Sequence, residues 1–113
     1  MPSPTSSLDH LIDVLGTEDV RDLVRIYLDQ TAKDLGRLLE LPVKKQIILV
    51  HGLKGSSSQV GAMMFAAQCG ALEAQLKHTD EPLSEAEVKA LSSGFEECAV
   101  PFRTWLGLPA KAG

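Results

Sequence analysis

Long apolar runs are missing from this 113-residue sequence, and no stretch approaches the roughly 20 apolar residues that a membrane-spanning helix needs. The start, MPSPTSSLDH, lacks the basic stretch and apolar core of a signal peptide, which favours a cytoplasmic protein without a membrane partner. The chain also lacks an excess of positive charge. Its net charge of −4 argues against nucleic acid as a general partner. With 44% hydrophobic residues, we expect one monomeric domain with a modest core.

Cysteine and aromatic residues are few. Without a signal peptide, Cys69 and Cys98 are more typical of reduced core residues than of a disulfide, and their spacing offers no metal site. One Trp, one Tyr and three Phe leave a mostly aliphatic core. His10 and His78 have no partners at metal-ligand spacing, so we expect neither a metal nor a cofactor.

Prolines and glycines divide the chain into segments with helical periodicity. Ser7 is expected to cap a short helix over residues 8–15, which Gly16 ends. Thr17 is expected to cap a long amphipathic helix, which Pro42 ends.

Three further helices are expected downstream: one to about residue 60, one over residues 62–77, and one that begins at a capping box of Ser84 and Glu87. No segment has the pattern of a strand. The sequence therefore predicts an all-α fold, an up-down-up-down four-helix bundle with a short additional N-terminal helix. The expected divisions are a flexible tail or linker over residues 1–7, the bundle over 8–108 and a flexible tail over 109–113.

The stretch VHGLKGSSSQVGA, residues 50–62, lies in the third expected helix. At about 100° per residue, one side of this helix carries the residues expected in the core: Leu49, Val50, Leu53, Ser57 and Val60. Another side carries a different set: Lys44, Ile47, Ile48, His51, Lys54, Gly55 and Ser58.

The second side suits a histidine that carries a phosphoryl group. A neutral imidazole nitrogen is a good nucleophile near pH 7, and Lys54 lies one turn from His51 to offset added negative charge. Gly55 removes a side chain that would block access, and Ile47 and Ile48 offer an apolar docking surface. On geometry alone, an ordinary surface histidine is an equal alternative.

Two other chemistries fail on spacing. A P-loop needs its lysine after the last glycine, whereas Lys54 precedes Gly55. A serine-hydrolase elbow needs a glycine two residues after the nucleophile, and Gln59 follows Ser57 instead.

The same stretch, with CGALE downstream, resembles the histidine-containing phosphotransfer (HPt) domain family of multistep phosphorelays. The resemblance rests on these residues: His51, Leu53, Lys54, Gly55, Ser56, Ser57, Val60, Gly61, Cys69, Leu72 and Glu73. It covers the third and fourth expected helices closely and the others in layout.

The resemblance implies that His51 accepts a phosphoryl group from a receiver-domain aspartate and passes it to another receiver. Lys54 would steady the phosphoryl group, Glu73 would bond the other imidazole nitrogen, and Lys77 would add a second positive charge. The receivers would belong to a hybrid sensor kinase, a response regulator, or both. The remaining residues expected to contact the partner are Lys44, Ile47, Ile48, Gly55 and Ser58.

Two function classes remain open from the sequence. One is a phosphocarrier without catalysis of its own, for which the receiver supplies the acidic pocket and metal. The other is a helical adaptor that is never phosphorylated. An adaptor needs none of His51, Lys54 and Gly55, so their combination favours the carrier.

Overall fold

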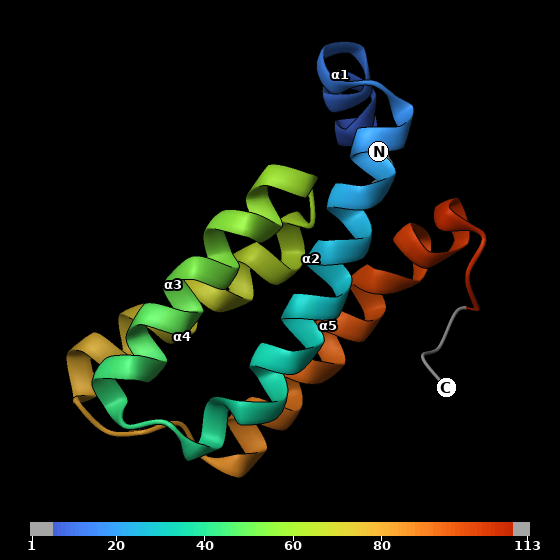
Figure 1. Ribbon diagram of the computed structural model, residues 1–113. Helices are drawn as coiled ribbons and strands as arrows, with labels where there is room; N and C mark the ends of the chain where they lie inside the picture. The colour runs from blue at the N-terminus through green and yellow to red at the C-terminus, as the bar shows by residue number, and fades with distance from the viewer. Residues whose placement is uncertain (1–5, 110–113) are drawn as a thin grey trace.

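The structure, a computed structural model, describes residues 6–109. Its helices run in this order: α1 (Ser6–Leu15), α2 (Thr17–Arg37), the 3-10 helix η1 (Leu38–Glu40), α3 (Val43–Val60), α4 (Met63–Thr79) and α5 (Glu85–Leu106). Helices α2 to α5 alternate in direction as a bundle, and α1 lies at the end where α2 begins (Figure 1). The expected all-α bundle is confirmed. No helix among the described residues is long and apolar enough to cross a membrane.

The first two helix boundaries differ from those expected. Helix α1 begins at Ser6, two residues before the expected start, and residues 1–5 of the expected tail lie outside the described residues. Thr17 is not the cap of α2, because it is already the first helical residue and Gly16 occupies the N-cap with φ 88°. That positive φ turns the chain from one helix straight into the next, so no residue is left to cap with a side chain.

Helix α2 also ends earlier than expected, at Arg37 rather than at Pro42, because the 3-10 helix η1 follows it; the boundaries of α3 to α5 agree more closely. Pro42 is the N-cap of α3, and Gly61, at φ 88°, ends it in the left-handed conformation that favours glycine. The capping box of α5 is present: Glu87 N–H donates to Ser84 Oγ at 3.1 Å, and Ser84 N–H donates to Glu87 Oε1 at 2.9 Å. Of the expected C-terminal tail, residues 110–113 lie outside the described residues.

The core is aliphatic with three phenylalanines, as the composition indicates. Its largest fully buried side chains include Phe65, Phe95, Phe102, Leu8, Leu38, Leu76 and Leu91. Two buried polar side chains of α3, Gln46 and Ser57, fix the helix within this core. Tyr27 of α2 and Ser57 of α3 share a hydrogen bond of 2.7 Å. The amide of Gln46, fully buried, donates to Leu38 O and accepts from Leu83 N–H, each at 2.9 Å. Because α3 is held near both of its ends, its outer side has a defined orientation.

Candidate functional site

Helix α3 presents His51 to solvent. The expected core residues Val50, Leu53, Ser57 and Val60 are all buried, and Leu49 is half-buried against the core. The His51 side chain, by contrast, is 66% exposed. The helical period thus separates the histidine from the core, as the sequence predicts.

His51 is nevertheless anchored on one side. Its Nδ1 lies 2.9 Å from Oε2 of Glu73, a residue of α4 that is only 5% exposed. An ionised carboxylate can only accept hydrogen bonds. Nδ1 therefore carries the proton and donates a hydrogen bond to Glu73. In the neutral imidazole the lone pair is then on Nε2, the nitrogen available for nucleophilic attack.

Two lysines keep Glu73 ionised. Lys54 Nζ lies 2.9 Å from Oε1, and Lys77 Nζ lies 3.0 Å from Oε2. They lower the pKa of Glu73 from 4.5 to about 2, Lys54 contributing most and Lys77 next, with a smaller contribution from His51, while burial of the carboxylate works in the opposite direction. One buried carboxylate therefore gathers the histidine and both lysines into a single cluster.

Gly70 is part of this arrangement and was not expected. A Cβ at Gly70 of α4 would lie 3.3 Å from Lys54 Cδ, so the absence of a side chain there leaves room for the Lys54 stem. The sequence carries a weak signal for this role, since Gly70 precedes Glu73 by one helical turn.

The expected partner-binding residues fall into two groups. Lys44 and Ser58 are exposed, and Gly55 is exposed with nothing within 4 Å of a Cβ placed on it. Ile48 is 66% exposed, whereas Ile47 is half-buried against the core. Ile47 therefore offers less open apolar surface than Ile48, and the contact of both isoleucines with a partner stays a prediction.

A groove between α2 and α3 was missed by the sequence analysis. It has a volume of about 400 Å³, and its lining includes Ile26, Asp34, Ile48 and Gly52, the last directly after His51 in the chain. Ile26 is 66% exposed although it is a large apolar residue. An isoleucine outside the buried stripe of α2 is the signal that could have located this surface.

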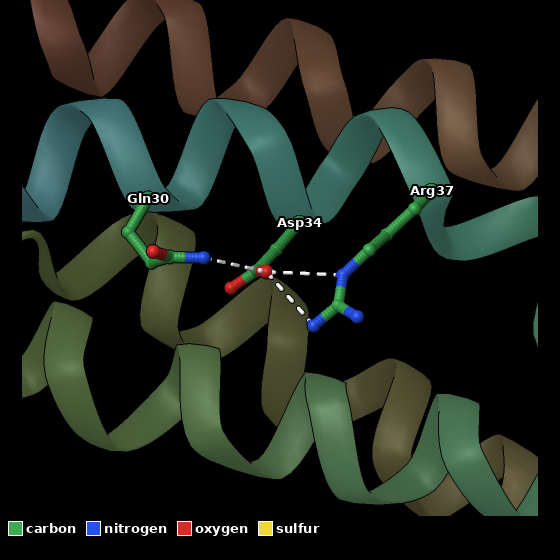
Figure 2. Close-up of polar contacts among 3 residues, drawn as sticks. All are labelled: Gln30, Asp34 and Arg37. Atoms are coloured by element: carbon green, nitrogen blue, oxygen red, sulfur yellow. Dashed lines mark hydrogen bonds and ion pairs between the residues drawn. The ribbon is translucent and has the colours of Figure 1, made fainter.

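The polar end of the groove is built around Asp34, which is 7% exposed. Figure 2 shows Gln30 and Arg37 converging on it from either side along α2. Gln30 Nε2 donates to Asp34 Oδ1 at 3.0 Å, and Arg37 donates to the same oxygen from Nε at 3.3 Å and from Nη2 at 3.1 Å. Three N–H donors thus hold this carboxylate at one end of a mostly apolar groove.

Among the described residues, no group of three or more His, Cys, Asp or Glu side chains is placed to hold a metal ion. A protein-family model described as Hpt domain matches residues 22–99, a span that includes all of α3 and α4. Neither the search of curated proteins nor the search of solved structures found a match.

Proposed function

The chain belongs to the Hpt domain family, whose members carry phosphoryl groups on histidine in phosphorelays, and we propose that His51 is the residue phosphorylated in this member. The observation that carries the proposal is the contact between His51 Nδ1 and the buried carboxylate of Glu73. It directs the imidazole lone pair to Nε2 on a side chain that solvent and a partner can reach.

The transfer follows from this geometry. Nε2 attacks the phosphorus of an aspartyl phosphate on a receiver domain; the N–P bond forms while the P–O bond to the aspartate breaks, and the aspartate leaves as a carboxylate. The ring becomes positively charged, because Nε2 gives up its lone pair and Nδ1 keeps its proton. Glu73 faces that proton with a full negative charge, which stabilises the developing cation. In the second transfer, the aspartate of another receiver attacks the phosphorus, the new P–O bond forms and the N–P bond breaks. Because Nδ1 keeps its proton, the ring leaves as a neutral imidazole, which is a better leaving group than an imidazolate.

The neighbouring side chains fit a carrier rather than an enzyme. Lys54, one turn after His51, supplies positive charge toward the phosphoryl oxygens. Two serines in the stretch are engaged in hydrogen bonds: Ser57 is fully buried and bonded to Tyr27, and the Ser56 hydroxyl donates to Gly52 O at 3.1 Å. We therefore propose that the receiver supplies the acidic pocket and the metal that the transfer requires.

The groove between α2 and α3 is the surface that we propose for receiver docking. Ile26 and Ile48 expose apolar side chains along it, and Ile48 lies on the same helix one turn before His51. A receiver seated there would bring its aspartate to the imidazole.

The experiment that tests the carrier function uses a phosphorylated receiver domain from a hybrid sensor kinase. We expect an acid-labile, base-stable label on the wild type and none on His51→Gln. A folded wild type that takes no label from receivers or from phosphoramidate would refute the carrier and favour the adaptor.

A second experiment tests the docking surface. Ile26→Ser and Ile48→Ser are expected to slow transfer from the receiver while leaving phosphoramidate labelling unchanged. Val14→Ser is the matched control, because Val14 is a branched apolar residue on α1 with a similar exposure of 68% and it does not line the groove. Equal transfer rates in all three variants would place the docking surface elsewhere.

A further inference from the structure

The two oxygens of Glu73 have different partners. Oε1 forms its ion pair with Lys54, whereas Oε2 is shared by the His51 ring and Lys77. If Lys54 moved to another anion, Glu73 would still keep a lysine on the oxygen that faces the imidazole. The two lysines are therefore not equivalent.

The two lysines also lie on different helices. Lys77 follows Glu73 by four residues on α4, the favoured order for a Glu–Lys pair, so this contact is internal to one helix. Lys54 is on α3, three residues after His51, and reaches across to Glu73. Lys54 thus belongs to the same helix as the histidine, and Lys77 belongs to the same helix as the carboxylate.

Burial makes the second lysine necessary. The Glu73 side chain is 7% exposed, so the loss of a lysine counter-ion is costly even though the phosphorylated ring of His51 stays cationic. When His51 carries a phosphoryl group, that group and the Glu73 carboxylate compete for Lys54. Without Lys77, its departure would leave Glu73 facing the imidazole with no lysine.

On the basis of the proposed function, we propose that Lys77 is a positioning residue: it keeps Glu73 paired, so that Lys54 can leave Oε1 for the phosphoryl group on His51. Lys77 then acts on the phosphorylated state through Lys54 and not by direct contact. This division of roles predicts a specific pattern of coupling between substitutions.

The test labels each variant with phosphoramidate and follows the half-life of the phosphohistidine. Lys77→Ala is expected to shorten it about two- to fivefold, the range for one partly exposed ion pair. The same substitution is expected to have no effect in a Lys54→Ala background, where there is no lysine to release. It is also expected to have none in a Glu73→Gln background, where Lys54 is not held by a carboxylate. Lys77→Arg should restore the wild-type half-life.

Lys89→Ala on α5 controls for the loss of one exposed positive charge. The proposal is overturned if Lys77→Ala behaves like this control. It is equally overturned if Lys77→Ala shortens the half-life as much in the Lys54→Ala background as in the wild type, because Lys77 would then act on the phosphoryl group directly.

A measurement without phosphate separates this proposal from the proposed function. Titration of Glu73 by carbon-13 NMR should give a pKa in Lys54→Ala that is still below the ordinary glutamate range, because Lys77 remains. In Lys54→Ala with Lys77→Ala, the pKa should rise into that range or above it. Equal values in the two variants would refute the role of Lys77 even if His51 is phosphorylated. Failure of the wild type to accept phosphate would instead refute the carrier function.

Discussion

Gly70 on α4 provides the space through which Lys54 of α3 reaches its carboxylate partner: a Cβ at Gly70 would lie 3.3 Å from Lys54 Cδ. A contact this short requires a shift of a few tenths of an ångström, and the lysine stem is flexible enough to move. Gly70 therefore influences the site through the stem of Lys54.

Gly70→Ala is expected to leave stability unchanged or to raise it by up to about 1 kcal/mol, the difference in helix propensity between the two residues. Because the Lys54 stem is displaced, the phosphohistidine half-life should fall. Gly36→Ala on α2 is the matched control, since nothing lies within 4 Å of a Cβ there. Thermal melting and the half-life of the label measure the two effects. A half-life equal to that of the control would mean that Lys54 adjusts without cost.

Glu73→Gln tests the ion cluster through its pH dependence. The folded-state pKa of about 2 lies below the ordinary 4.5, so Glu73 contributes stability that is present above about pH 4.5 and lost as the pH falls toward 2. The glutamine variant lacks this contribution. Urea unfolding at a series of pH values should show the wild type losing on the order of 3 kcal/mol relative to the variant over this interval. Parallel stability curves would show that Glu73 titrates normally.

His51→Gln is expected to keep the fold and abolish phosphorylation. The side chain is 66% exposed and lies outside the core, so the change in unfolding free energy should be below about 1 kcal/mol. Glutamine can still donate a hydrogen bond to Glu73, which preserves the anchor. Thermal melting checks the fold. A large drop in melting temperature would mean that His51 is a structural residue.

The sequence predicts those features that depend on the helical period and on local motifs. The buried side of α3, the exposed His51 and the capping box at Ser84 each follow from residues of a single helix and its cap. Glu73, 22 residues after His51, could be assigned to the histidine only through the family resemblance. Periodicity alone does not say which side chains of two helices meet.

What the sequence could not predict depends on how neighbouring helices pack. Ile47 is half-buried, although the period places it beside His51, because the edge of an exposed stripe is covered wherever the next helix approaches. Gly70 matters through one atom of Lys54 on another helix. The groove at Ile26 exists only once α2 and α3 are placed side by side.

The final prediction concerns Gly55, four residues after His51 on the exposed side of α3. A Cβ at Gly55 meets nothing within 4 Å, so Gly55→Gln should raise stability by a good fraction of about 1 kcal/mol through helix propensity. Its side chain would nevertheless stand beside the imidazole that the receiver aspartate must approach in line. Since a displacement of about 1 Å can cost a hundredfold in rate, transfer from the receiver should fall by about tenfold or more. Labelling by phosphoramidate, which needs no docking surface, should stay near the wild-type rate. Gly36→Gln on α2, also open to solvent, should gain the same stability without any loss of transfer. If Gly55→Gln transfers as fast as Gly36→Gln, the space above Gly55 is not used by the partner.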